Sequence, residues 1–278
     1  MEFAIGRKLL VPAGIQSLLS DLVHERTGIF FEPERVDILV EKLSPLACAR
    51  ECFSLLDYYY LLKYEKYGEA EWDRVMDALS VQETYFWREM AQVRVMVDVL
   101  VPQWFGKTSA PLRIWSAASA SGEEPFSLAM ALVEAGWGTH PIEIVASDAS
   151  PTALEKCRAA LYRENSFRGF PRDLREKYFR SQGNEWQLIP EITRRVAFHR
   201  ANLAAADEIS PLARSPVVFC RNVFIYFSSH SVRQTLAVLA SRMPRGGHLF
   251  VGISESLLRL TADFELREIG DAFVYVRV

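Results

Sequence analysis

The spacing of apolar residues in the first 80 positions predicts a small helical domain. Apolar side chains recur there at intervals of three and four, as on one face of a helix. Four segments share this spacing: 18–23, which stops at Gly28; 36–43, which we expect to end near Pro45; 53–64; and 72–79. No convincing strand lies among them, so this part of the chain is expected to form a helical bundle.

From residue 112 onward, short β-rich apolar runs alternate with helical segments. The predicted strands are LRIWSAA (112–118), IEIVAS (142–147), VAFHRA (196–201), PVVFC (216–220), GHLFVGI (247–253) and AFVYVRV (272–278). The predicted helices are 123–135, 151–161 and 229–243. Several strands are nearly continuous apolar runs, which is typical of strands covered on both faces. The alternation therefore predicts an α/β fold with a doubly wound parallel sheet.

Two segments depart from this alternation. The last predicted strand follows its predecessor without a clear helix, so we expect an antiparallel final hairpin. Residues 165–195 are rich in aromatic and basic side chains and are expected to form a small insertion. The predicted organisation is an N-terminal helical domain with its linker over 1–90 and a sheet domain over 91–278.

The composition is that of a folded protein with a sizeable core. Half of the 278 residues are apolar, 24% are charged, and the net charge is −3. This balance argues against wholesale nucleic-acid binding, which requires a basic face. The charge is uneven, because residues 1–90 hold 10 basic and 16 acidic side chains.

Membrane and secretory signals are missing from the pattern. No run approaches the roughly 18 apolar residues of a membrane helix, and Glu2 and Pro12 interrupt the start where a signal peptide would be apolar. We expect a cytoplasmic protein without membrane insertion. The four cysteines are too few for a disulfide scaffold, and no His or Cys set completes a zinc site, so free thiols and no bound metal are expected.

The first predicted strand runs through WSAASASGEEP into a helix. Small residues and Gly122 would let a ligand approach the backbone. The segment is neither a dinucleotide fingerprint nor a phosphate-binding loop. Glu123 and Glu124 at the helix start would repel a phosphate, whereas they suit a cation such as S-adenosylmethionine. The alternative is that both glutamates only stabilise the helix N-terminus.

An acidic residue follows the second predicted strand. Asp148 comes 26 residues after Gly122, where a nucleoside ribose would offer its two hydroxyls. The alternative is a cap for the helix starting at Pro151, although Ser150 could provide that cap. Together the loop and the acid indicate a nucleoside cofactor without phosphate.

Three further strings make the prediction specific: VQETYFWRE (81–89), RANL (200–203) and VVFCRNVFIYFS (217–228). With the loop after residue 115 and Asp148, they resemble the CheR family of chemotaxis-receptor methyltransferases, over about residues 20–278. The resemblance implies a protein-glutamate O-methyltransferase that uses S-adenosylmethionine, releases S-adenosylhomocysteine and modifies the cytoplasmic helices of chemoreceptors in signal transduction. It also implies a helical domain, a methyltransferase sheet, and a small antiparallel subdomain at 165–195.

The resemblance also assigns site residues by motif. The implied cofactor-binding set is Gln82, Thr84, Arg88, Ala118, Glu124, Asp148, Asn202, Leu203, Arg221 and Asn222. The implied catalytic set is Arg88, Arg221 and Tyr226.

Within these sets the resemblance gives each position a role. Glu124 would hold the methionine ammonium and Asp148 the ribose, while Asn202 and Leu203 would border the adenine. Gln82 stands where many relatives have Asn.

The residue types suit the transfer of a methyl group to a carboxylate. A glutamate with a reference pKa of about 4.3 is already ionised near neutral pH and needs no general base. Arginine binds a carboxylate bidentately and tyrosine orients a lone pair. Two arginines beside a sulfonium repel it until an anion enters, so we expect the site to prefer carboxylates over amines. The alternatives are an ion pair of Arg88 with Glu83 or Glu89, a core position for Tyr226, and a helix cap for Asn222.

Some features depart from the family pattern. The second helical segment has only Arg35 and Lys42 as basic residues, although relatives present a basic helix there. This suggests a less acidic target, or docking led by the C-terminal half. The small subdomain is short, so we expect no strong dependence on a receptor C-terminal tether peptide. Glu83 occupies a commonly apolar position.

Arginines at 158, 163, 168, 172, 175 and 180 form a basic stretch that would attract acidic helices or be a solvated face. Two other functions stay open: a small-molecule carboxyl methyltransferase and a non-catalytic, cofactor-binding signalling partner.

Overall fold

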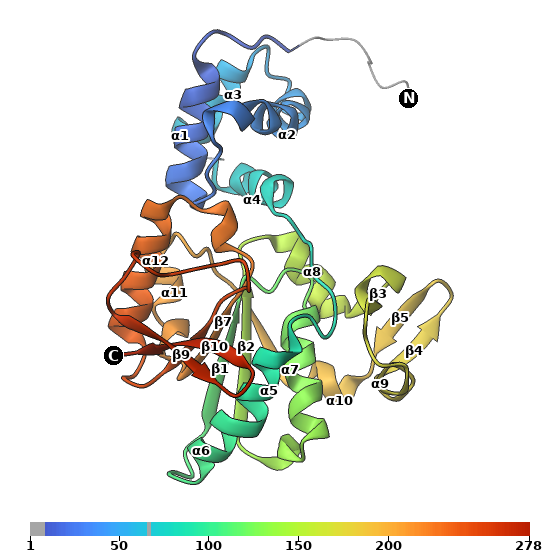
Figure 1. The fold of residues 1–278 in the computed structure, drawn as a ribbon. Coiled ribbons are helices and arrows are strands. Elements are labelled where there is room, and N and C mark those ends of the chain that lie inside the picture. Colours follow the sequence, from blue (N-terminus) through green and yellow to red (C-terminus); the bar gives the residue numbers. More distant parts are fainter. Residues whose placement is uncertain (1–8, 66–67) are drawn as a thin grey trace. The chain divides into compact units, whose positions relative to one another are not determined.

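The structure, a computed structural model, describes residues 9–65 and 68–278. The chain folds into two compact units, residues 1–80 and 81–278 (Figure 1). The segment 81–90, grouped above with the N-terminal domain as a linker, is part of the second unit.

The first unit is all-helical in the part that is described, as predicted. Its helices are α1 Ile15–Thr27, η1 Pro33–Arg35, α2 Val36–Ala49, α3 Leu55–Tyr64 and α4 Gly68–Leu79. Gly28 ends α1 with a φ of 77°, and its amide donates to the carbonyl of His24 at 2.9 Å, so the predicted stop is confirmed. Fully buried leucines of α1, α2 and α3 form the core.

The predicted end of α2 near Pro45 is wrong, because the helix continues through Pro45 to Ala49. A proline inside a helix removes one backbone donor and normally disfavours the helix. Here Leu43 and Ala47, on either side of the proline, are both fully buried. Their burial in the core favours continuation of the helix over the local preference of the proline.

The second unit is built on a seven-stranded sheet. Its strands are β1 Leu112–Ala117, β2 Ile142–Asp148, β6 Val196–Arg200, β7 Val217–Cys220, β8 His248–Phe250, β9 Phe264–Ile269 and β10 Ala272–Arg277. Their order is β6-β2-β1-β7-β8-β10-β9, parallel up to β8 and antiparallel at β10 and β9. The chain winds to one side of β1 through β2 and to the other through β7, so the sheet is doubly wound as predicted. The switch point, where ligands bind in such sheets, lies between β1 and β7.

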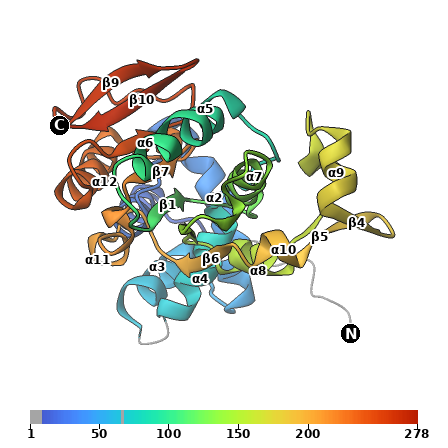
Figure 2. The same ribbon diagram turned by 90° about the horizontal axis from the view of Figure 1, so that it is seen from below.

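Helices cover both faces of this sheet (Figure 2). They are α5 Met90–Val95, η2 Met96–Leu100, α6 Val101–Phe105, α7 Glu123–Glu134, η3 Trp137–Thr139, α8 Pro151–Ala159, α11 Ala206–Ile209, η5 Leu212–Arg214, η6 Phe224–Tyr226 and α12 Ser229–Arg242. Alternate residues of β1 enter different cores: Ile114 packs with the α5 and α7 side, and Trp115 with the α12 side. The two-sided burial explains why the parallel strands are nearly continuous apolar runs.

The antiparallel ending is confirmed, but the sequence reading missed a strand. β10 pairs with β8 on one side and with β9 on the other. In β9 only Phe264 is buried, and the edge position leaves its other side chains in contact with solvent. The hairpin turn at Gly270, with a φ of 56°, was the available signal.

A small three-stranded antiparallel sheet confirms the predicted insertion. Its elements are β3 Leu161–Tyr162, η4 Glu164–Phe167, α9 Arg172–Tyr178, β4 Phe179–Gln182, β5 Glu185–Leu188 and α10 Pro190–Thr193, with strand order β3-β5-β4. The helix α10 leads back to β6 of the main sheet. We call residues 161–193 the small subdomain.

Candidate functional site

A strap formed by residues 81–89 lies along one side of the switch point and is anchored in the small subdomain. The ring of Phe86 is fully buried, and ring centroids of Tyr162, Phe167 and Phe179 lie within 4.8 to 5.4 Å of it. The Phe86 amide donates to the carbonyl of Ser166 at 2.8 Å. An aromatic cluster of this kind holds the strap firmly, so the polar residues on either side of Phe86 have defined positions.

The loop after β1 is shaped by backbone bonds and by the small size of its residues. The Ala120 amide donates to Asp148 Oδ2 at 2.9 Å, which ties the loop to the end of β2. Gly122 has a φ of 95°, and a Cβ there would lie 3.1 Å from both the Cys157 sulfur and the Phe126 ring. Only glycine fits this position, and α7 starts directly after it.

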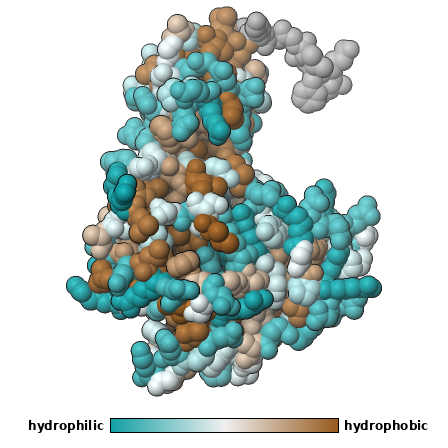
Figure 3. All heavy atoms as spheres, viewed as in Figure 1, coloured by the Kyte–Doolittle hydropathy of each residue, from teal (hydrophilic) through white to brown (hydrophobic). Residues whose placement is uncertain are grey.

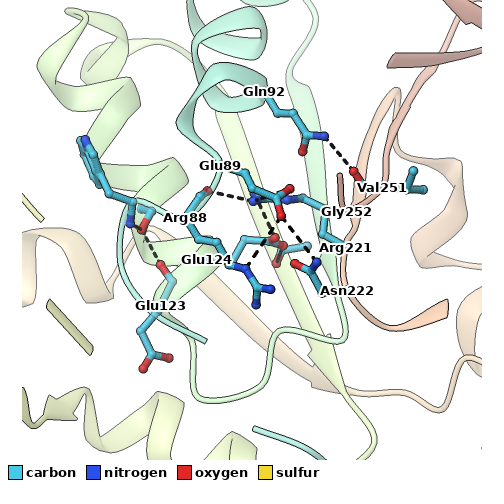
Figure 4. A network of polar contacts seen from close by, with 12 residues as sticks. Arg88, Glu89, Gln92, Glu123, Glu124, Arg221, Asn222, Val251 and Gly252 are labelled. Carbon is cyan, nitrogen blue, oxygen red and sulfur yellow. Dashed lines mark hydrogen bonds and ion pairs between the residues drawn. The ribbon is translucent and has the colours of Figure 1, made fainter. Parts of the chain in front are cut away.

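A buried arginine joins the three segments at the switch point (Figure 4). Arg221 follows β7, and its side chain is 2% exposed. Its Nη2 lies 3.2 Å from Glu89 Oε2 in the strap and donates to the Arg88 carbonyl at 2.8 Å. Its Nη1 lies 3.3 Å from Glu124 Oε2 at the start of α7. One guanidinium therefore faces two carboxylates of the chain itself.

The two segments after β7 and β8 are joined by a further carboxylate. Glu255 accepts from the amides of Asn222 at 2.8 Å and of Gly252 at 2.6 Å. A Cβ on Gly252 would lie 2.4 Å from Asn222 Nδ2, so the close packing requires glycine. This contact fixes the backbone of Asn222, which has a φ of 57°.

Left-handed backbone is concentrated in this region. Eight non-glycine residues in the described ranges have positive φ, and five belong to the segments just described. These five are Trp87, Glu89, Ala118, Ala120 and Asn222. Each costs on the order of 1–3 kcal/mol and persists where surrounding structure enforces it, which is typical of functional sites.

The three segments line a cleft that is open to solvent, with about 540 Å³ of empty space when its open mouth is included. The cleft is lined by Val81, Glu83, Thr84, Tyr85, Arg88, Val93, Ala118, Ser119, Ala120, Glu124, Ser127, Arg221 and Asn222. Six residues expected in the site therefore come together: Thr84, Arg88, Ala118, Glu124, Arg221 and Asn222.

The other expected residues lie outside this lining. Asp148 accepts the amides of Ala120 and Ser150, both at 2.9 Å, while the hydroxyl of Ser150 caps α8. Asn202 and Leu203 follow β6, next to the end of β2.

The last two expected residues are Gln82 in the strap and Tyr226 after β7. Gln82 Oε1 accepts from Lys156 Nζ at 2.6 Å. Tyr226 lies in η6 and is half-buried. Burial raises the pKa of Tyr226, and the positive charge of Arg88 partly offsets the rise.

Glu89 and Glu255 are functional candidates that the sequence reading did not place in the site. The sequence suggested Glu89 only as an alternative ion-pair partner of Arg88. In the structure, Arg88 Nε lies 3.9 Å from Glu89 Oε1. The only sequence signal that could have placed Glu89 in the site is its position in the motif VQETYFWRE, and Glu255 belongs to no such motif.

The electrostatics of the cleft depend on Glu124. Burial raises the pKa of Glu124, while the charge of Arg221 and the Ser116 hydroxyl at 2.6 Å oppose the rise. Its neighbour Glu123 points away from Arg221 and accepts from the hydroxyls of Ser121 and Ser166 at 2.7 and 2.8 Å. Burial raises the pKa of Glu123 as well.

Most arginines of the basic stretch are paired with glutamates of the chain, whereas Arg180 donates to backbone carbonyls. Arg163 pairs with Glu185 at 3.0 Å, Arg168 with Glu83 at 2.6 Å, and Arg175 with Glu164 at 2.5 Å. Polar side chains, both acidic and basic, dominate the visible face of this subdomain (Figure 3). The pair with Arg168 also accounts for Glu83, the acidic residue at a commonly apolar position.

The residues of the cleft fit a cationic, phosphate-free nucleoside. Its lining has no lysine, one of its two arginines is paired with two carboxylates, and Glu124 stands at the start of α7 where a phosphate would otherwise bind. Small residues at 118–120 allow close approach to the backbone. Within residues 9–65 and 68–278 no cluster of three or more His, Cys, Asp or Glu side chains could hold a metal ion. Fold and cleft thus define a doubly wound enzyme of the S-adenosylmethionine-binding class.

Comparison with known proteins agrees with this class. The description "CheR methyltransferase, all-alpha domain" matches residues 17–80, and "CheR methyltransferase, SAM binding domain" matches residues 82–273. Chemotaxis protein methyltransferase 2 of Vibrio cholerae is 33% identical over 92% of this chain and 90% of its own. Chemotaxis protein methyltransferase 1 of Pseudomonas aeruginosa is 33% identical over 91% and 94%. The Escherichia coli chemotaxis protein methyltransferase is 29% identical over 90% and 86%.

The chain belongs to the CheR methyltransferase family and is an S-adenosylmethionine-dependent methyltransferase. No helix in the parts of the chain that the structure describes is long and apolar enough to span a membrane.

Proposed function

We propose that this protein transfers the methyl group of S-adenosylmethionine to glutamate side chains of chemoreceptors, forming methyl esters. The observation that carries the proposal is the match to both CheR domains over residues 17–80 and 82–273. The cleft supports it, since its lining holds both Arg88 and Glu124, an acid suited to the ammonium.

Arg88 is the arginine that receives the substrate carboxylate. It lines the cleft, its Nη1 donates to the Glu83 carbonyl at 2.9 Å, and its nearest described carboxylate is 3.9 Å away. Arg221 is buried and contacts two carboxylates and a carbonyl. We therefore assign Arg221 to the support of Glu124 rather than to the substrate.

The reaction requires little proton transfer by the protein. When bound, S-adenosylmethionine supplies an electrophilic methyl group on a positively charged sulfur. The substrate carboxylate oxygen forms the new C–O bond as the C–S bond breaks, and the electron pair stays on sulfur. Arg88 orients the carboxylate for this displacement. A tyrosine with an ordinary pKa of about 10 is protonated at neutral pH, and burial raises the pKa of Tyr226 further, so its hydroxyl can donate to the second carboxylate oxygen.

Glu124 holds the methionine ammonium, and Asp148 holds the ribose hydroxyls at the end of β2. The amides of Ala120 and Ser150 each bond a different oxygen of Asp148, which fixes its orientation. Asn202, Leu203 and Gln82 complete the cofactor site from the neighbouring strand end and the strap.

The test uses labelled S-adenosylmethionine and membranes that contain chemoreceptors. Base-labile label on a receptor band is expected, and Arg88→Ala should lose it. Arg172→Ala, which removes an exposed arginine paired with Glu176, serves as the matched control and should label receptors normally. Label released only into small molecules would instead favour a small-molecule carboxyl methyltransferase. Cofactor binding without any transfer would favour a non-catalytic signalling partner.

We propose further that the protein works in the cytoplasm and without strong dependence on a receptor tail peptide. All four cysteines are free thiols, which suits a reducing compartment. The strands of the small subdomain span only two to four residues, which leaves little edge for peptide addition. Micromolar binding of a receptor-tail peptide in calorimetry would contradict the second statement.

A further inference from the structure

We propose that Glu89 is a positioning residue that shares Arg221 with Glu124, so that Arg221 does not fully neutralise Glu124 and the site keeps an excess of negative charge for the ammonium of the methyl donor. The proposal rests on the role of Glu124 given under the proposed function. Glu89 itself is placed to act through Arg221 and need not touch the donor.

The contacts of Arg221 define the arrangement (Figure 4). Its two terminal nitrogens are divided between the acids, with Nη2 at 3.2 Å from Glu89 and Nη1 at 3.3 Å from Glu124. The side chains of Glu89 and Glu124 are 12% and 17% exposed. Bulk water therefore screens this set of charges weakly.

The charges of the set do not balance without a ligand. At the buried guanidinium of Arg221, two carboxylates face one positive charge, which leaves an excess of one negative charge; the second arginine nearby, Arg88, lies 3.9 Å from Glu89 and is assigned above to the substrate carboxylate. An ammonium beside Glu124 adds a second positive charge, which balances the two carboxylates that face Arg221. Without the charge of Glu89, Arg221 alone would neutralise Glu124, and an arriving ammonium would meet an already compensated acid.

The backbone holds Glu89 in place for this role. Glu89 has a φ of 52° and immediately precedes α5. Such a conformation is unfavourable for a glutamate and needs support from its surroundings. The Arg88 carbonyl receives an Arg221 hydrogen bond at 2.8 Å, and Asn222 Nδ2 lies 3.5 Å from Glu89 Oε1. The turn thereby directs the carboxylate toward Arg221.

The test compares Glu89→Gln, which keeps the shape and removes the charge, with Glu89→Asp, which keeps the charge. Glu185→Gln is the matched control, because Glu185 is also a partly buried glutamate paired with an arginine. Calorimetry with S-adenosylhomocysteine at pH 7.5 measures affinity in the full-length proteins, and thermal unfolding checks that each is folded. We expect affinity to fall about tenfold or more in Glu89→Gln, to recover largely in Glu89→Asp, and to stay unchanged in Glu185→Gln.

The pH dependence of affinity distinguishes a charge effect from a loosened site. Glu124 faces Arg221, Arg88, Glu89 and the hydroxyl of Ser116, and the negative charge of Glu89 contributes to the raised pKa of Glu124. Removing that charge lowers the pKa of Glu124. The loss of affinity in acid, where Glu124 takes up a proton, should therefore move to lower pH in Glu89→Gln.

The outcomes separate this proposal from the one it rests on. Wild-type affinity in Glu89→Gln, or a loss that is equal at all pH values, would overturn the role of Glu89. A folded Glu89→Asp that binds no better than Glu89→Gln would also overturn it. Glu124→Gln is expected to weaken binding strongly; if it does so while Glu89→Gln does not, only the role of Glu89 fails. Wild-type affinity in Glu124→Gln would refute both roles.

Discussion

Replacing Arg221 with methionine should destabilise the second unit strongly at neutral pH. The side chain of Arg221 is 2% exposed and separates two carboxylates that lie 3.2 and 3.3 Å from its nitrogens. Methionine has a similar volume but no charge, so the main effect is that two largely buried acids lose their closest cation and keep only Arg88, which lies 3.9 Å from Glu89. Removing one partner of a buried pair costs about 3–5 kcal/mol. For a unit of this size that corresponds to a fall in Tm of roughly 10 °C.

The destabilisation should depend on pH in a defined direction. The pKa of Glu124 is already raised by burial, and losing Arg221 raises it further. A carboxyl whose pKa is higher in the folded state binds more protons there, so stability falls as pH rises from its ordinary pKa to the raised value. At pH 5, where more of Glu124 is protonated, the variant should therefore be destabilised less than at pH 7.5.

Chemical denaturation of the full chain at pH 5 and pH 7.5 measures both effects. Arg163→Met is the control, because Arg163 is exposed and its pair with Glu185 contributes less than about 1 kcal/mol. A loss below about 1 kcal/mol for Arg221→Met at pH 7.5, or the same loss at both pH values, would refute the reasoning.

Three further predictions concern the strap and the cleft. Arg88→Ala should lower the initial rate of receptor methylation about a hundredfold or more, with less than a tenfold change in S-adenosylhomocysteine affinity by calorimetry; a wild-type rate would remove its assigned role. A double-mutant cycle with Glu83→Gln and Arg168→Gln should give only a small coupling free energy in denaturation at low salt and none at 1 M salt, because the pair is exposed; a large, salt-independent coupling would disagree. Gly252→Ala should cost about 1–3 kcal/mol of stability and raise the KM for S-adenosylmethionine, since the new Cβ would lie 2.4 Å from Asn222 Nδ2; unchanged Tm and KM would show that the cleft adapts.

The fold could be predicted from sequence where local pattern and burial agree. The parallel strands are buried on both faces, so β1, β2 and β7 appear as apolar runs. The family motifs assigned Ala118 and Asn222 to the site, and the structure brings them to one cleft because both follow neighbouring parallel strands. β9 escaped notice because its exposed edge position leaves few apolar side chains to reveal it.

The partners of the charged residues were beyond prediction from sequence. Glu89 lies next to Arg88 in the chain, yet its nearer ion pair is with Arg221, more than 130 positions away. That partner depends on the left-handed turn at Glu89, which no local preference indicates. The arginines of the small subdomain likewise suggested a basic face, although glutamates such as Glu83 and Glu164 pair with most of them. Sequence shows which charges exist, and tertiary structure decides which of them meet.

The left-handed residues around the cleft have a consequence for protein engineering. A library selected only for heat resistance would collect Gly or Asn at Trp87, Ala118 and Ala120, where these residues relieve an unfavourable backbone. Such changes would also free the loops that shape the cleft, so the most thermotolerant clones should include poor catalysts. Selection for resistance should therefore be paired with selection for turnover.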